Sequence, residues 1–177
     1  MSKSKESKSI QSKILSDLLA GFDVATELLS LPPYAAPRHH FEYHMARKEW
    51  DRVYGAERKK RRILHNMRKK KWIHDRRKGN EIIVRIFSDG IVASLKHRIR
   101  STTKKLRKGT LCLLSYDFPN GATKARNFWR RLLRSVGLRK EQLSLYSTER
   151  DVIHELRAVV KVLGAERWIR VFEAIER

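Results

Sequence analysis

Residues 72–87 read WIHDRRKGNEIIVRIF, and this stretch decides the fold expected for the first half of the chain. Ile82, Val84 and Ile86 alternate with Ile83, Arg85 and Phe87, as the two faces of a β-strand would. Gly79-Asn80 supplies a turn after the polar run before this strand. The pair Asp89-Gly90 is expected to end the second strand. The stretch therefore predicts a β-hairpin. Its tip is basic and carries Arg76, Arg77 and Lys78.

The segment before the hairpin is strongly basic, because 12 of the 22 residues from Glu57 to Lys78 are Lys or Arg. A helix is predicted over 56–71, with Ile63, Leu64 and Met67 on its inner side. A basic helix followed by a hairpin with a basic tip is typical of the winged helix-turn-helix. In that arrangement the helix enters the major groove of DNA and the wing lies against the backbone or the minor groove.

The candidate phosphate contacts are the cations of this helix and of the hairpin tip: Arg58, Lys59, Arg61, Arg62, Arg68, Lys69, Arg76, Arg77 and Lys78. A run of charge can also be only a solvated surface. Here the charge is concentrated on one helix and one turn, which favours nucleic-acid binding.

The rest of the first half has four expected segments. Residues 1–9 are polar and are expected to form a disordered tail, and 10–31 carry the period of an amphipathic helix. A further helix is expected over 38–54, and helical spacing continues from Ile91 to Lys108. Together, residues 10–108 are predicted to be a winged helix-turn-helix domain with flanking helices.

The second half predicts a compact α/β arrangement. The expected order of strand, helix, strand, helix and strand covers 111–116, 125–136, 142–146, 152–163 and 167–172. Thr148, with Asp151 three residues on, resembles the capping box of the second helix, and Gly137 is a good stop for the first. This order predicts a small ferredoxin-like sandwich over 109–177.

Charge separates the two halves. The chain has 177 residues, with 41 Lys and Arg against 19 Asp and Glu, a formal net charge of +22 that favours a polyanionic partner. Residues 1–108 hold +17 of it, from 28 basic against 11 acidic residues, so a domain boundary is placed near Lys108-Gly109. The hydrophobic fraction of 41% is that of an ordinary folded protein.

Cysteine use and hydropathy indicate the compartment. The single cysteine, Cys112, lies in an apolar run and is expected to be a buried, inert thiol, which fits a reducing cytoplasm. The longest apolar stretch, 14–31, carries three acidic residues, and the start of the chain lacks the pattern of a signal peptide. We therefore expect a cytoplasmic protein without a membrane partner.

Asp117 is the one candidate for metal chemistry. It follows a predicted buried strand, a position where α/β folds commonly hold functional groups. One carboxylate binds Mg²⁺ only weakly, so a structural role in the turn or as a helix cap is favoured, and no cofactor is expected. In the alternative, Asp117 from two protomers would bind Mg²⁺ across a two-fold axis.

Residues 111–172 resemble a known domain. The motif Ser-Tyr-Asp-Phe-Pro at 115–119, Arg126 and Arg130 on the next helix, Gly137, and Gln-Leu-Ser-Leu-Tyr at 142–146 carry the resemblance. The segment is similar to the ferredoxin-like domain of the CRISPR-associated protein two family. That domain also follows a winged helix-turn-helix in PaaX-type transcriptional repressors, which this chain resembles in domain order.

The resemblance has consequences for fold and partners. It implies a repressor-like regulator that binds duplex DNA and forms a homodimer through its C-terminal domain. Because only Ser147 separates Tyr146 from the expected cap at Thr148, the family's β-hairpin at this point is predicted to be short or missing.

The sequence thus predicts an α+β protein, a winged helix-turn-helix followed by a ferredoxin-like sandwich, that acts as a DNA-binding transcriptional regulator. Two alternatives remain open. One is a metal-dependent nuclease or CRISPR spacer-acquisition subunit that uses Asp117, and the other is an RNA-binding protein, for which the charge is equally suitable.

Overall fold

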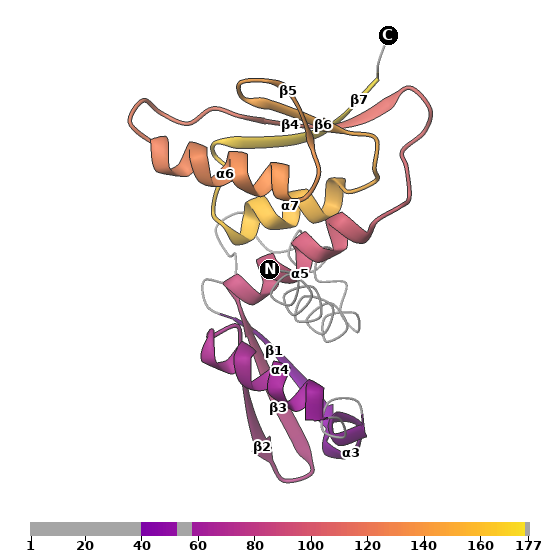
Figure 1. Ribbon diagram of the computed structural model, residues 1–177, viewed down its shortest axis with the longest axis vertical. Coiled ribbons are helices and arrows are strands. Elements are labelled where there is room, and N and C mark those ends of the chain that lie inside the picture. The colour runs from indigo at the N-terminus through magenta and orange to yellow at the C-terminus, as the bar shows by residue number, and fades with distance from the viewer. Residues whose placement is uncertain (1–39, 53–57, 176–177) are drawn as a thin grey trace. The chain divides into compact units, whose positions relative to one another are not determined.

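The computed structural model describes residues 40–52 and 58–175. They form a mixed α+β protein with two antiparallel sheets, one in each of two units (Figure 1). The first unit contains the described residues up to Ser94 and the second those from Leu95 onward, so the division falls within one helix. The boundary predicted near Lys108-Gly109 lies further along, in the loop before the next strand. The tail predicted at 1–9 and the helix predicted at 10–31 lie outside the described residues.

The first unit is built around a three-stranded sheet of order β1-β3-β2, antiparallel throughout. Its elements are β1 (His40–Ala46), α3 (Arg47–Trp50), α4 (Arg58–Lys69), β2 (Ile73–Lys78), β3 (Glu81–Phe87) and the start of α5 (Ser88–Ser101). The central strand β3 joins the other two, so its side chains supply much of the core.

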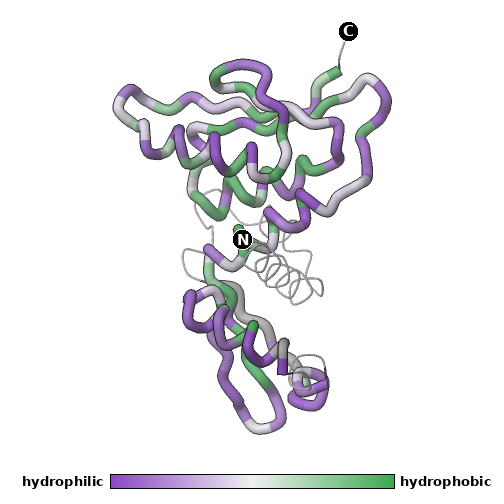
Figure 2. The backbone as a smooth tube through the Cα atoms, in the orientation of Figure 1, coloured by the Kyte–Doolittle hydropathy of each residue, from purple (hydrophilic) through white to green (hydrophobic). Residues whose placement is uncertain are grey.

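The predicted hairpin is confirmed. Strands β2 and β3 pair from Ile73 with Ile86 to Lys78 with Glu81. Gly79, the first of the two turn residues, has a φ of 58°, which two-residue hairpin turns accommodate best with glycine. Figure 2 shows β3 as a hydrophobic strand beside the hydrophilic β2. Burial does not alternate along β3, because Ile82, Ile83 and Val84 are buried in succession.

The helix predicted over 38–54 is wrong in its first part. Residues 40–46 form strand β1, which pairs with β3 along its whole length, and only the short α3 follows. Phe41, Tyr43 and Met45 alternate with polar residues, which is the period of a strand, and aromatic residues favour strands. The partner strand lies far along the chain, so nothing in the neighbouring sequence signals the pairing.

Helix α5 begins earlier and ends earlier than predicted. Asp89 and Gly90 lie in its first turn instead of ending the hairpin, and a Cβ on Gly90 would lie 2.7 Å from the carbonyl oxygen of Trp72. The helix stops at Ser101, before the Lys108 expected from the spacing. Next to it the Thr102 hydroxyl donates to the carbonyl of Arg98 at 2.8 Å. The Thr102 N–H donates to the same carbonyl at 2.9 Å, and the β-branched residues Thr102 and Thr103 disfavour a further turn of helix.

The second unit is a four-stranded antiparallel sheet of order β5-β6-β4-β7 with two helices on one face (Figure 1). Its elements are the end of α5, then β4 (Thr110–Tyr116), α6 (Thr123–Ser135), β5 (Arg139–Gln142), β6 (Leu145–Thr148), α7 (Ile153–Val162) and β7 (Ile169–Ile175). The predicted strand at 111–116 and the two predicted helices are confirmed. Gly137 and Gly164 adopt positive φ values after these helices, and the stop predicted at Gly137 is confirmed.

The core of this unit lies between the sheet and the helices. Cys112, Leu114 and Tyr116 alternate inward from β4, while Leu133 and Leu156 come from the two helices, and all are buried. The prediction of a buried thiol is confirmed. Burial raises the pKa of Cys112 to about 12, because desolvation disfavours the thiolate.

The strand predicted at 142–146 is wrong, because a turn interrupts it. The hairpin predicted to be short or missing is present and short, with four residues in each strand. Two strands, β5 and β6, form a hairpin whose turn is Leu143-Ser144. Strand β5 is an exposed edge made of charged and polar residues, so it has no apolar alternation to reveal it. The capping box is also wrong. Thr148 belongs to β6, and α7 begins after Val152 without a side-chain cap.

Candidate nucleic-acid interface

One side of α4 is exposed along its length and strongly basic. A helix of 3.6 residues per turn places positions three and four apart on one face. The exposed residues at this spacing, here named the α4 basic face, are Arg58, Arg61, Arg62, His65, Arg68 and Lys69. No acidic residue lies within α4, so the face presents cations alone.

The opposite side of α4 fixes this orientation. Ile63, Leu64 and Met67 are buried, Met67 completely, together with the apolar face of β3. Burial of such a side chain contributes about 1.5–3 kcal/mol, so rotating the helix to hide its cations would lose several kcal/mol. The basic face is therefore held outward by the core and not by its own charges.

The end of α4 has an unusual backbone. The Trp72 N–H donates to the carbonyl of Met67 at 3.0 Å and the Lys71 N–H to that of Arg68 at 2.9 Å, the paired bonds of a Schellman motif. The residue at the left-handed position is Lys71, with a φ of 55°, where glycine is usual. The chain turns here from the helix into β2.

An ion pair joins α4 to the hairpin. Arg68 Nε and Nη2 donate to the two carboxylate oxygens of Asp75 at 2.5 and 2.6 Å. The hydrogen bonds and the charge of Asp75 raise the pKa of Arg68. Arg68 was predicted to contact phosphate. In the structure it also connects α4 to β2 through its bonds to Asp75.

The tip of the hairpin carries the remaining predicted contacts. Arg76 and Lys78 point to one face of the hairpin and Arg77 to the other, since successive strand residues alternate. All three are exposed. Within 40–52 and 58–175 no hydrogen bond or ion pair engages their side chains. The tip can therefore offer cations on both of its faces.

The structure brings the predicted contacts together in the first unit. Eight of the nine have described side chains, all exposed, on α4 and the hairpin tip; the side chain of Lys59 lies outside the described part. Sequence reasoning missed His65 in the middle of the α4 basic face. Its spacing of three from Arg62 and four from Arg61 is the signal that would have included it.

Asp117 belongs to the second unit and directly follows β4. Its N–H donates to the carbonyl of Trp168 at 2.9 Å, and its side chain is exposed. Asp117 was predicted to act in the turn or as a helix cap; the helix cap is wrong, since α6 begins after Ala122. Phe118 packs between the rings of Tyr116 and Trp168. In the part of the chain that the structure describes, no group of three or more His, Cys, Asp or Glu side chains could hold a metal ion.

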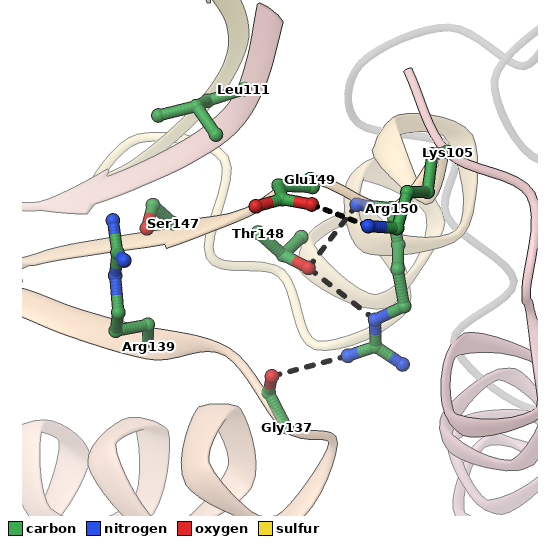
Figure 3. Close-up of a pocket in the computed structure, with 8 residues that line it drawn as sticks. All are labelled: Lys105, Leu111, Gly137, Arg139, Ser147, Thr148, Glu149 and Arg150. Carbon is green, nitrogen blue, oxygen red and sulfur yellow. Dashed lines mark hydrogen bonds and ion pairs between the residues drawn. The ribbon is translucent and has the colours of Figure 1, made fainter. Parts of the chain in front are cut away.

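A pocket of about 230 Å³ in the second unit contains several cations, but they are already engaged (Figure 3). Lys105 pairs with Glu149 at 2.7 Å, and Arg139 Nε donates to Glu141 at 2.6 Å. Arg150 Nη1 donates to the carbonyl of Ile99 and Nη2 to that of Val136, at 2.6 and 2.7 Å. Arg150 thus satisfies carbonyls at the ends of α5 and α6, and the pocket is a structural junction.

Comparison with protein families and with curated proteins gives no match to this chain. Over the described ranges, every helix is too short or too polar to cross a membrane.

Proposed function

We propose that this protein is a transcriptional regulator that binds duplex DNA through its first unit. The observation that carries the proposal is the α4 basic face, held outward by a buried opposite side and continued by three exposed cations at the hairpin tip. A continuous basic helix beside a basic hairpin matches the negative charge of a duplex backbone.

The order of elements supports a winged helix in this unit. Strand β1, helices α3 and α4, and the hairpin β2–β3 follow one another, and the sheet order is β1-β3-β2. In this interpretation α4 is the recognition helix and the hairpin is the wing. The bond between Arg68 and Asp75 adds a direct contact between them.

This arrangement assigns different roles to the two groups of cations. Arginines of α4 would reach base edges in the major groove, where the guanidinium can bond to guanine in a bidentate manner. Arg76, Arg77 and Lys78 would contact phosphates and contribute affinity without sequence preference. Affinities of variants for several DNA sequences distinguish the two roles, because only contacts to base edges depend on the sequence.

The second unit supports the ferredoxin-like part of the proposal. Its elements follow the order strand, helix, strand, strand, helix, strand, and its sheet order places β4 between β6 and β7. This is the arrangement implied by the resemblance to PaaX-type repressors and to the CRISPR-associated protein two family. A homodimer through this unit would use the sheet face without helices, where Phe172 is 39% exposed beside Leu113.

Binding of the full chain to duplex DNA tests the proposal. Sites are selected from a random duplex pool, and fluorescence anisotropy then measures affinity across a salt series. The logarithm of affinity should fall linearly with that of salt concentration, with a slope of about −0.9 for each phosphate contact.

A charge-matched pair of variants gives the control. Changing Arg76, Arg77 and Lys78 to Ala should weaken binding to all duplexes and flatten the salt dependence. Changing Arg107, Lys108 and Lys140, three exposed cations of the second unit, removes the same charge outside the interface. Equal losses in the two triple variants, or a flat salt response of the wild type, would contradict the proposal.

A further inference from the structure

Helix α6 in the second unit has an exposed face with the same spacing as the α4 basic face. Its residues recur three and four apart along one side of the helix and are all exposed. This α6 face consists of Lys124, Asn127, Phe128, Arg131, Arg134 and Ser135. The opposite side buries Trp129, Leu132 and Leu133 against the sheet, so the face is fixed toward solvent.

Four of the five cations of α6 fall into two groups. The helix has five Lys and Arg and no Asp or Glu. Arg126 and Arg130 turn toward the end of β4, where they bond to the Phe118 carbonyl at 3.5 Å and the Tyr116 hydroxyl at 3.2 Å. Lys124 and Arg131, on the α6 face, form no hydrogen bond or ion pair with any described residue. These two cations are available to a partner.

An aromatic ring lies between those two cations. Phe128 is 42% exposed, although its size favours burial. Its ring packs edge-on against buried Trp129, with centroids 6.0 Å apart and planes at 89°. This contact limits the motion of the ring, so the Phe128 side chain loses little conformational entropy when a partner stacks on its exposed side.

We propose that the α6 face binds single-stranded nucleic acid, with Phe128 stacking on a base and with Lys124 and Arg131 on the flanking phosphates. The two cations are seven residues apart, a rise of about 10.5 Å along the helix, with Phe128 between them. Stacking on an aromatic side chain beside phosphate-binding cations is the general mode of single-strand recognition.

The partner class follows from charge and aromatic character together. A duplex covers the faces of its bases by stacking, so an exposed ring adds nothing to its binding, whereas an unpaired base can use it. A protein partner is less well matched, because the core of a protein interface is depleted of charge and this ring lies among cations. This activity is separate from the duplex binding proposed for the first unit.

Binding of the full-length protein to labelled oligothymidine, which cannot pair with itself, tests the inference. Phe128→Ala should weaken this binding by about fivefold or more, the lower end of the effect of removing one stacked base. Leu143→Ala, which removes an exposed apolar side chain from the turn between β5 and β6, should leave it unchanged. Phe128→Trp should keep or improve it.

A second pair of variants tests the cations. Lys124→Gln with Arg131→Gln should reduce the salt slope by about 1.4, at about 0.7 for each single-strand phosphate contact. Arg107→Gln with Lys108→Gln removes the same charge elsewhere in the unit and should reduce the slope less. Circular dichroism and thermal melting confirm that each variant is folded.

Several outcomes would overturn the inference. The inference fails if Phe128→Ala binds oligothymidine as tightly as the wild type. It also fails if Leu143→Ala loses as much affinity as Phe128→Ala, or if the two double variants behave alike. Duplex affinity is measured in parallel. A loss on oligothymidine with normal duplex binding supports the α6 site, whereas failure of duplex binding with intact oligothymidine binding contradicts only the proposed regulator function.

Discussion

Replacing Asp75 by asparagine distinguishes two contributions of the hairpin to DNA binding, its position relative to α4 and its charge. The change removes the carboxylate that holds Arg68 and raises the net charge of the proposed interface by one. Charge alone predicts tighter binding to any DNA. Loss of the link between α4 and β2 predicts weaker discrimination between sequences, because the hairpin, the proposed wing, loses one of its contacts with α4, the proposed recognition helix.

The geometry sets the size of the effect on stability. Both bonds between Arg68 and Asp75 are short and lie in the fork arrangement, the strong form of this contact. The Asp75 side chain is 13% exposed, but that of Arg68 is 45% exposed, so solvent screens the pair. We expect a coupling free energy of about 1 kcal/mol between the two residues. Asp75→Asn alone should cost about 1–2 kcal/mol, because the amide presents only one acceptor to the guanidinium.

Two measurements check this prediction. Urea unfolding of the wild type, Asp75→Asn, Arg68→Gln and the double variant gives the coupling free energy. Anisotropy on the selected duplex and on an unrelated duplex gives the discrimination. Glu81→Gln is the control, since it makes the same charge change on the hairpin at a carboxylate that faces His44. A coupling free energy near zero, or equal discrimination by Asp75→Asn and Glu81→Gln, would refute the reasoning.

Four further predictions concern single side chains. Lys71→Gly should raise the free energy of unfolding by about 1 kcal/mol in urea titrations, because it relieves a left-handed backbone at a non-glycine residue. Arg150→Met should lower it by about 1–3 kcal/mol, since carbonyls at two helix ends lose their donor, and Arg150→Lys should lower it less. The Cys112 thiol should resist alkylation at pH 8 in the native protein but not in urea. The pKa of Cys112 is about 12 in the folded protein, against about 8.5 in the unfolded chain. Its contribution to stability is therefore complete below the unfolded pKa and falls as the pH rises toward the folded pKa. Cys112→Ala should remove this loss of stability at high pH. Asp117→Asn should leave duplex affinity unchanged, and Mg²⁺-dependent cleavage of RNA or DNA by the wild type alone would contradict the proposed function.

The elements that the sequence revealed are those whose signal is local. Helix α4 and the β2–β3 hairpin each carry their period and their turn within a short stretch, and the outward cations follow from the same spacing. Strand β1 and strand β5 were missed for different reasons. The pairing of β1 depends on the distant β3, while β5 is a charged edge strand with no apolar period. The bond from Arg68 to Asp75 joins two elements and could not be read from either one alone.

The α4 basic face makes its own helix less stable. Arg58 lies three and four residues from Arg61 and Arg62, and like charges at these spacings cost a helix a few tenths of a kcal/mol each. The core does not require them, because the buried side of the helix already fixes its position. A polyanion that neutralises these cations converts their repulsion into binding free energy. The same reasoning applies to Arg131 and Arg134 on the α6 face, where the spacing is again three. In each unit, a nucleic-acid partner would stabilise the helix by neutralising the like charges that weaken it. Added salt should raise the stability of the unbound protein, because it screens the same repulsion.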